Sequence, residues 1–168
     1  NGGKVNFQLH FSPICIDDKY GYDAYDLYDY PRADGFTILP TLLHPKSRGT
    51  VSLSSSDPND APIIQPNFLE EKEDLDQLVK GGKLVFKIMN DDALRKHTLR
   101  DRLPFDRNSE DSLIEHIKKT LETVYHPVGT CKMGVDSMAV VDPMLKVHGI
   151  SNLRVVDASI MPLIVSGN

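Results

Sequence analysis

The stretch YHPVGTCKMG, residues 125–134, places a histidine directly before a proline and crowds two glycines behind it. A neutral imidazole can accept a proton near neutral pH, because the pKa of an unperturbed histidine is about 6.5. Proline at 127 disfavours the helical conformation for the residue before it, so we expect a preceding helix to end near His126. His126 is therefore a candidate general base. The alternative is a structural histidine at a helix C-terminus, where a cation is favoured.

The other reactive side chains form no recognised site. The six histidines contain no H-x-x-x-H pair and do not cluster with Cys15 or Cys131, so a zinc site is not expected. The two cysteines could form one disulfide, but their spacing indicates no disulfide framework. Neither Ser159 nor Ser166 lies in the G-x-S-x-G elbow of a hydrolase.

The sequence indicates no catalytic role for the remaining histidines. His148 is expected to be a turn residue at the end of a strand, and His116 to lie on the exposed side of its helix. No partner can be identified from the sequence for His10, His44, His97 and His116.

The composition describes a globular protein. The chain has 168 residues, a hydrophobic content of 40% and a formal net charge of −5. A nucleic-acid surface needs a basic stripe and a membrane-spanning helix needs about 20 mostly apolar residues in succession, and the sequence shows neither. Because the chain starts without methionine and stops at a polar turn after an apolar stretch, we interpret it as a fragment.

Three segments in the N-terminal third are strand-like. Period-two alternation of apolar residues predicts a strand over residues 4–11, and residues 35–43 and 49–55 have a similar character. Pro40 should place part of the second segment at a sheet edge or a bulge, because proline cannot donate a ladder hydrogen bond. Residues 54–67 are rich in turn formers and are predicted to be a loop.

Two helices are predicted after these strands. Apolar residues at three- and four-residue steps predict a helix over residues 69–89, and the Gly81-Gly82 pair within it indicates close packing against a neighbour. Ser109 is an N-cap candidate for a second helix, whose apolar stripe runs on toward His126. His126 would then project from a fixed point at a helix end.

The order of elements predicts the fold class. Short extended pieces over residues 139–141, 145–147 and 153–156 follow the helices and alternate with turns. Strands and helices stand in separate blocks, which favours an α+β fold with an antiparallel sheet flanked by helices. Residues 12–35 break this regularity with interleaved tyrosines and aspartates. They are either a surface loop whose rings pack onto the body or a lid or partner surface.

Four stretches, in this order and spacing, resemble the C-terminal part of glucose–methanol–choline (GMC) oxidoreductases: HPKSRGTVSLSSSDPNDAPIIQPNFL (44–69), YHPVGTCKMG (125–134), VVDPMLKVHGISNLRVVDASIMP (140–162) and SGN (166–168). Each stretch alone is a weak match, and together they are specific. The resemblance is strongest over residues 120–168. It extends to insect glucose dehydrogenase-like and choline dehydrogenase-like members, which would allow an extracellular location.

The resemblance implies a flavoenzyme that oxidises the CH–OH group of a small alcohol and passes hydride to FAD. Residues 1–134 would form the substrate domain, and residues 135–168 a truncated segment that returns to the FAD-binding domain. No G-x-G-x-x-G fingerprint occurs in the chain, so the N-terminal Rossmann-like part is absent. We therefore expect the chain alone to show no flavin absorbance and to need, as its partner, the missing FAD-binding domain of the same polypeptide.

The resemblance also implies roles for individual residues. His126 would face the flavin and accept the alcohol proton, and Asn168 would hydrogen-bond the substrate oxygen without itself titrating. Asp157 and Ala158 would lie along the ribityl and pyrophosphate portion of FAD. The alternatives are a turn-capping role for Asp157, a plain turn role for Asn168, and, for the whole chain, a catalytically silent binding module that retains the sheet fold.

Overall fold

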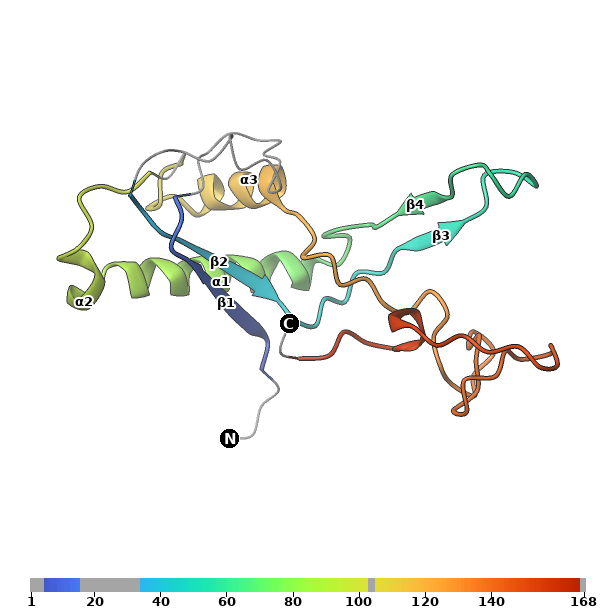
Figure 1. Cartoon of the computed structure of the whole chain (residues 1–168). Helices are drawn as coiled ribbons and strands as arrows, with labels where there is room; N and C mark the ends of the chain where they lie inside the picture. The colour runs from blue at the N-terminus through green and yellow to red at the C-terminus, as the bar shows by residue number, and fades with distance from the viewer. Residues whose placement is uncertain (1–4, 16–33, 103–104, 167–168) are drawn as a thin grey trace. The chain divides into compact units, whose positions relative to one another are not determined.

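The described part of the chain comprises three segments of the computed structural model, residues 5–15, 34–102 and 105–166 (coloured in Figure 1). Most of the tyrosine- and aspartate-rich run lies outside these segments, so its interpretation as a lid or partner surface stays a prediction. Asn168 also lies outside the described residues.

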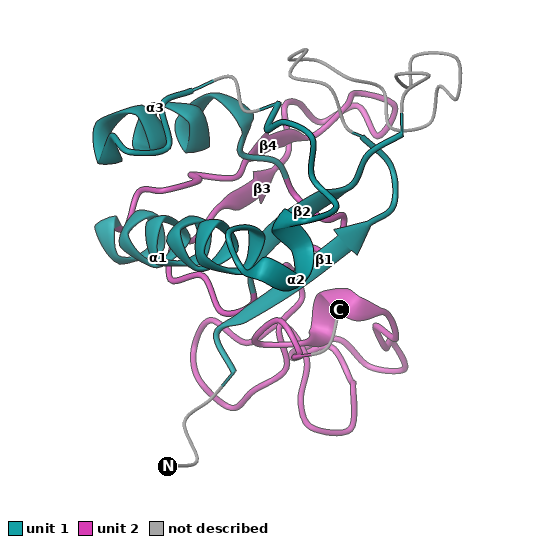
Figure 2. Cartoon of the chain, turned by 90° about the vertical axis from the view of Figure 1, so that its left-hand side faces the viewer, with its two compact units in different colours: residues 1–42, 72–122 teal, residues 43–71, 123–168 magenta. Residues whose placement is uncertain are grey.

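The chain forms two compact units, which have different colours in Figure 2. Unit 1 consists of residues 1–42 and 72–122, and unit 2 of residues 43–71 and 123–168. The predicted boundary after residue 134 concerns the domains of a whole enzyme and stays a prediction.

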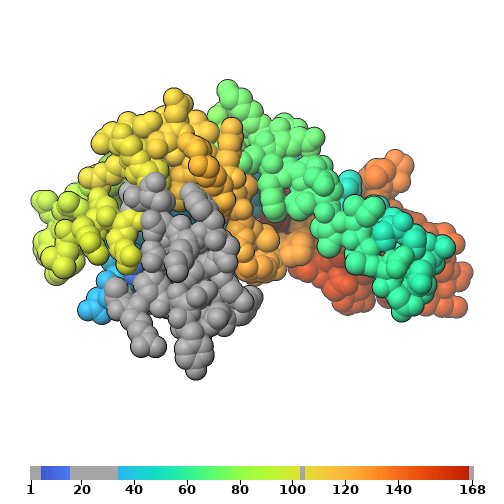
Figure 3. Space-filling model, turned by 90° about the horizontal axis from the view of Figure 1, so that it is seen from above, coloured from blue at the N-terminus to red at the C-terminus, as the bar shows by residue number. Residues whose placement is uncertain are grey.

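Unit 1 combines a two-stranded antiparallel sheet with helices (Figure 1). Its elements are β1 (Phe7–Ser12), β2 (Thr37–Leu42), α1 (Lys72–Met89), α2 (Asp92–Arg95) and α3 (Glu110–Thr120). α1 contacts both β2 and α3, and the side chains of the two helices adjoin in the space-filling view of Figure 3. This arrangement confirms the predicted α+β fold with an antiparallel sheet and flanking helices.

Pro40 lies at an edge of the sheet, as predicted. It stands opposite Leu9 in the register that pairs Phe7 with Leu42. Among the described residues, β1 is the only strand paired with β2. The other side of β2 is thus an edge, where the missing N–H of a proline leaves no ladder hydrogen bond unmade.

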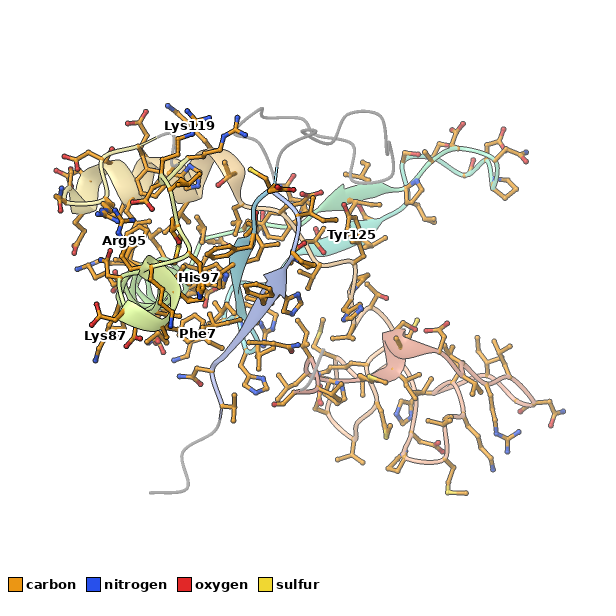
Figure 4. The ribbon with its side chains drawn as sticks, turned by 60° about the vertical axis from the view of Figure 1, so that its left-hand side comes forward. Phe7, Lys87, Arg95, His97, Lys119 and Tyr125 are labelled. Atoms are coloured by element: carbon orange, nitrogen blue, oxygen red, sulfur yellow. The ribbon has the colours of Figure 1, made fainter. Side chains whose placement is uncertain are left out.

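The Gly81-Gly82 pair lies where α1 meets its neighbours, which confirms the prediction of close packing. A Cβ at Gly81 would lie 3.0 Å from Cε1 of Phe7, labelled on β1 in Figure 4, and 3.3 Å from Cβ of Pro40. A Cβ at Gly82 would lie 3.2 Å from Cδ1 of Leu113 on α3. The absent side chains let α1 approach both the sheet and α3.

The start of α3 is confirmed. The side chain of Ser109 accepts a hydrogen bond from the N–H of Ser112 at 3.2 Å, so Ser109 is the N-cap of the helix. This bond satisfies one of the backbone donors that a helix start leaves open.

The predicted end of this helix is wrong. α3 ends at Thr120 with Leu121 as its C-cap, and His126 therefore does not project from a helix end. Thr123 and Val124 are β-branched and form helices poorly. The hydroxyl of Thr123 also accepts a hydrogen bond from the N–H of Tyr125 at 2.8 Å, in a local turn that competes with the helix.

His116 on α3 is half-buried, whereas the sequence placed it on the exposed side. Its ring stacks on Phe105 with centroids 4.4 Å apart, and Phe105 packs in turn against Phe86 of α1. Burial lowers the pKa of His116, because water solvates the charged ring less well there. The aromatic ring of Phe105, which comes before the helix, supplies a contact that the helix pattern alone could not show.

In its described residues, 43–71 and 123–166, unit 2 contains one hairpin and one short helix. β3 (Thr50–Ser52) pairs antiparallel with β4 (Ile63–Gln65), and η1 (Ala158–Ile160) is a 3-10 helix. The prediction of a loop is therefore wrong over β4. Ile63 and Ile64 are β-branched and favour a strand, while the turn formers before them provide the connection between the two strands.

Residues 123–166 form little regular structure apart from η1. Isolated bridges join Val141 to Met133 and to Val147, and Lys146 to Arg154, so the predicted extended pieces do pair with one another. Val141 lies at the centre of these bridges and is fully buried, with a relative exposure of 0%. Isolated bridges around the buried side chain of Val141 therefore hold this part of the backbone.

Candidate active site

His126 is exposed and lies in the irregular backbone that follows α3. Tyr125, labelled in Figure 4, directly precedes it with a φ of 62°, a left-handed conformation that bulky residues rarely adopt. The hydrogen bond from Tyr125 to Thr123 holds this turn. The ring of His126 has no hydrogen-bond partner within the described residues, so it is open to an external ligand.

Three backbone hydrogen bonds join the histidine stretch (residues 125–134) to the turn formed by Asp157 and η1. The N–H groups of Gly129 and Cys131 donate to the carbonyl of Ser159 at 3.1 and 3.0 Å. The N–H of Met133 donates to the carbonyl of Ile160 at 2.8 Å. The structure thus brings together two of the stretches that the sequence singles out.

Gly129 is the closest described link between the histidine and this turn. Its φ is +92°, and a Cβ there would meet only the carbonyl of Met161, at 3.6 Å. His126 precedes Gly129 by three residues, so covalent geometry keeps their Cα atoms within about 11 Å. The histidine is therefore tethered near the turn that begins at Asp157.

Asp157 caps η1. Its Oδ1 accepts a hydrogen bond from the N–H of Ser159 at 2.7 Å. Hydrogen bonds from the side chain and the backbone of Ser159 lower the pKa of Asp157, because they stabilise the ionised carboxylate. The turn-capping role is thus present in the structure, and the contact of Asp157 with FAD stays a prediction.

The exposed surface around these residues fits the FAD that the resemblance implies. His126, Thr130, Asp157 and Ala158 are all exposed. The N–H groups of Thr130 and Ala158 donate to no acceptor in the described part of the chain. The N–H of Ala158 stands at the start of η1 and that of Thr130 in a turn. Open backbone donors of this kind suit the carbonyl and phosphate oxygens of such a cofactor.

Further contacts shape the loop that follows the histidine stretch. Lys132 forms an ion pair with Asp136 at 3.0 Å, and the Nε2 of His148 lies 3.1 Å from the carbonyl of Gly134. The hydrogen bond from Lys132 lowers the pKa of Asp136. A Cβ at Gly134 would lie 3.0 Å from Asp136 and 3.3 Å from Ala139. A side chain at Gly134 would therefore have to displace the carboxylate of Asp136 and press on Ala139.

The structure reveals a partner for His44 that the sequence does not. The Nε2 of His44 lies 3.0 Å from the Oγ of Ser166, the last described residue before Gly167 and Asn168. The two residues are 122 positions apart, so no local pattern could have indicated the contact.

A metal site is not part of the described structure. No group of three or more histidine, cysteine, aspartate or glutamate side chains in residues 5–15, 34–102 and 105–166 could hold a metal ion. Cys15 and Cys131 are both free thiols.

Comparison with known proteins identifies relatives over nearly the whole chain. The pattern of the family described as GMC oxidoreductase matches residues 45–168. The chain is 42% identical over 166 residues to an alcohol dehydrogenase [acceptor] of Pseudomonas putida, and 40% identical over 164 residues to an oxygen-dependent choline dehydrogenase of Cronobacter sakazakii. These alignments cover 98% and 97% of this chain but only 29% and 28% of the two relatives.

Solved structures show the same likeness. Pyridoxine 4-oxidase from Mesorbium loti matches 98% of this chain with a TM-score of 0.84 and 31% identity, and the match covers 31% of that protein. An FAD-dependent oxidoreductase from Chaetomium thermophilum matches 79% of this chain with a TM-score of 0.74 and 28% identity, over 23% of its own length.

Neither the helices nor these relatives indicate a compartment. Within the described residues, no helix has both the length and the apolar character needed to cross a membrane. The two curated relatives are bacterial and give no support to the extracellular location that a resemblance to insect members would allow.

Proposed function

We propose, because this chain belongs to the GMC oxidoreductase family, that it contributes the catalytic surface of an FAD-dependent enzyme that oxidises the CH–OH group of a small alcohol. FAD is the cofactor of the family, as in the similar oxidoreductase of Chaetomium thermophilum. The chain spans less than a third of the length of its curated relatives, so the activity would belong to a longer polypeptide.

His126 is the proposed general base. A ring nitrogen would accept the hydroxyl proton of the alcohol as the C–H bond on the same carbon breaks, which leaves an aldehyde or ketone. Bound FAD supplies the acceptor for the hydride. The exposed ring and its lack of a partner within the described residues support this role, because a base must be able to reach its substrate.

The other predicted residues have supporting roles in this proposal. The amide of Asn168 would donate a hydrogen bond to the oxygen on which negative charge develops. Ala158 would offer its open N–H to FAD, and Asp157 would hold the turn that presents it. The observation that carries the proposal is the set of backbone hydrogen bonds from Gly129, Cys131 and Met133, which place the histidine stretch beside that turn.

The proposed partner is an N-terminal FAD-binding domain in the same polypeptide. Unit 2 exposes large apolar side chains: Val135 is 89% exposed, Met138 76% and Val156 72%. Apolar surface of this kind is often a binding surface for another part of a protein. Its position on the same unit as the histidine stretch supports a domain that covers unit 2 and holds FAD.

Anaerobic reduction of the flavin tests this function. The full-length protein that contains this chain would be mixed with a panel of alcohols that includes choline, pyridoxine and aryl alcohols. We expect at least one class to bleach the bound flavin and to yield the matching aldehyde. A flavin that a chemical reductant bleaches but no alcohol does would contradict the proposal, and a full-length protein that binds no flavin would favour the silent binding module.

A further inference from the structure

An aromatic cluster of three rings, Phe86, Phe105 and His116, joins α3 to α1 within unit 1. The ring centroids of Phe105 and His116 lie 4.4 Å apart, and those of Phe86 and Phe105 lie 6.0 Å apart. We propose that His116 makes this cluster sensitive to pH: the neutral ring holds α3 against Phe105, and protonation of the ring in mildly acidic solution loosens α3. This inference goes beyond the proposed function, because none of the three rings takes part in the proposed chemistry.

The Nδ1 atom of His116 is buried and has no hydrogen-bond partner among the described residues. A neutral imidazole leaves one ring nitrogen without a proton, whereas the protonated ring carries an N–H on both nitrogens. A buried N–H without an acceptor, on a ring that also bears a charge, costs more free energy than an unused lone pair. The packed arrangement therefore favours the neutral ring.

The hydroxyl groups one turn away on α3 are already engaged. The Oγ of Ser112, four residues before His116, accepts a hydrogen bond from the N–H of Asp106 at 3.3 Å. The Oγ1 of Thr120, four residues after it, donates to the backbone carbonyl of His116 at 2.8 Å. Residues four apart lie on the same face of a helix, so these hydroxyls are well placed in sequence but have other partners.

No charged group on the elements around the cluster is a described counter-ion of His116. The acidic side chains there have other partners, which are Lys119 for Glu115, Lys83 for Glu110, Arg95 and Arg107 for Asp101, and the N–H of Asn108 for Asp106. Asp111 is exposed, and a spacing of five residues puts it on another side of α3. Lys87 on α1 and Lys118 on α3 are exposed cations, which would not stabilise a positive ring.

The direction of the pH effect follows from this burial. Burial lowers the pKa of His116 below its ordinary value of 6.5, so the unfolded chain binds a proton at a higher pH than the folded protein does. The stability that the packed neutral ring provides is complete above that value and is lost as the pH falls toward the folded-state pKa. The attraction of a cation to the face of Phe105 opposes this loss but leaves the buried N–H without an acceptor.

The test measures hydrogen exchange in the full-length protein between about pH 5 and pH 8, the range in which histidine changes its charge. Exchange of α3 peptides, corrected for the intrinsic effect of pH, reports local opening of the helix. His116→Phe keeps a ring that can stack on Phe105 but cannot be protonated, and His116→Gln is a second variant without a titratable ring. His97→Gln, at an exposed histidine of unit 1 without a described partner, is the matched control.

We expect α3 of the parental protein to lose protection as the pH falls below about 6.5. The loss should approach tenfold for each pH unit that separates the folded and unfolded pKa values of His116. His116→Phe and His116→Gln should lack this loss, and His97→Gln should retain it. Protection of β3 and β4, which belong to unit 2, should respond to pH equally in all four proteins.

A loss of α3 protection that is the same in the parent and in His116→Phe would overturn the proposal. Protection that rises in acid would overturn it as well, because the attraction to Phe105 would then outweigh the cost of the buried N–H. An equal loss in α3 and in the β3–β4 hairpin of the parent would indicate global unfolding and would contradict a local effect. If His116→Phe does not fold, the comparison of His116→Gln with His97→Gln decides the same question.

Discussion

His126 and Asp157 are both exposed but differ in their hydrogen bonding. The ring of His126 is exposed and has no partner within the described residues, while the carboxylate of Asp157 is engaged by Ser159. A general base must be free to approach its substrate, whereas a capping residue acts through the backbone that it holds. We therefore propose proton transfer for His126, and we treat Asp157 as a residue that shapes the turn.

The cap makes a pH-dependent contribution to stability. The pKa of Asp157 is lower in the folded state than the ordinary value of 3.8, so its contribution is present above that value and is lost as the pH falls through the folded-state pKa. Asp157→Asn keeps an acceptor for the N–H of Ser159 but cannot ionise. We expect the parental melting temperature to exceed that of Asp157→Asn at neutral pH, and the difference to shrink below about pH 4.

Thermal unfolding across this pH range checks the prediction. Asp157→Ala, which removes the acceptor altogether, is the control and should melt below Asp157→Asn at every pH. A difference between the parent and Asp157→Asn that does not change with pH would rule out an ionised cap.

At the residue scale, the sequence indicates some interactions between neighbouring residues, but it does not indicate interactions between residues far apart in the chain. The proline after His126 predicted a helix end there, which is wrong, whereas the turn-capping alternative for Asp157 is present in the structure. The hydrogen bond between His44 and Ser166 depends on the path of the whole chain, so no spacing rule reveals it. The left-handed conformation of Tyr125 is a local feature that its residue type does not indicate, because bulky residues rarely adopt it.

At the element scale, the glycine pair in α1 gives a sharp test of packing. A Cβ at Gly81 would press on the Phe7 ring and on Pro40, whereas one at Gly82 would meet only side-chain carbons of Leu113, the nearest at 3.2 Å. Alanine raises helix stability by up to about 1 kcal/mol relative to glycine, but overpacking costs about 1–3 kcal/mol. We expect Gly81→Ala to lower the free energy of unfolding by about 1 kcal/mol, and Gly82→Ala to change it by less than about 0.5 kcal/mol.

Urea unfolding of the two variants measures these effects, and each serves as the matched control of the other. Phe7→Leu should relieve part of the loss in Gly81→Ala, because the ring atoms that clash are then absent. Equal destabilisation by the two alanines would contradict the packing described for α1.

Helices and strands can be predicted where their sequence patterns, such as a cap residue or apolar periodicity, do not depend on tertiary contacts. The N-cap at Ser109 and the periodicity of α1 belong to this class, and both are confirmed. β4 was hidden because turn formers surround Ile63 and Ile64, and a strand of three residues gains its hydrogen bonds only by pairing with β3. α3 ends early because the residues after Thr120 form helices poorly and because the Thr123 hydroxyl binds the N–H of Tyr125 in a turn. The spacing of apolar residues shows neither effect.

At the scale of the whole molecule, the chain corresponds to one part of its longer relatives. It matches its curated relatives over 98% and 97% of its own length but over less than a third of theirs. The nucleotide fingerprint is absent from the sequence, and exposed apolar side chains mark unit 2. Binding of FAD by the chain alone is therefore not expected, and the proposed chemistry needs the longer polypeptide.

The rate of flavin reduction in a His126→Ala variant of that polypeptide is the most direct measurement of the proposed chemistry. Rapid anaerobic mixing with a saturating alcohol, at equal FAD content, isolates the chemical step. His97→Ala, a change at an exposed histidine in unit 1, is the matched control and should reduce its flavin at the parental rate. We predict that His126→Ala slows reduction by about a hundredfold or more, the usual scale for loss of a general base. Reduction of its flavin at close to the parental rate would contradict the assignment of His126.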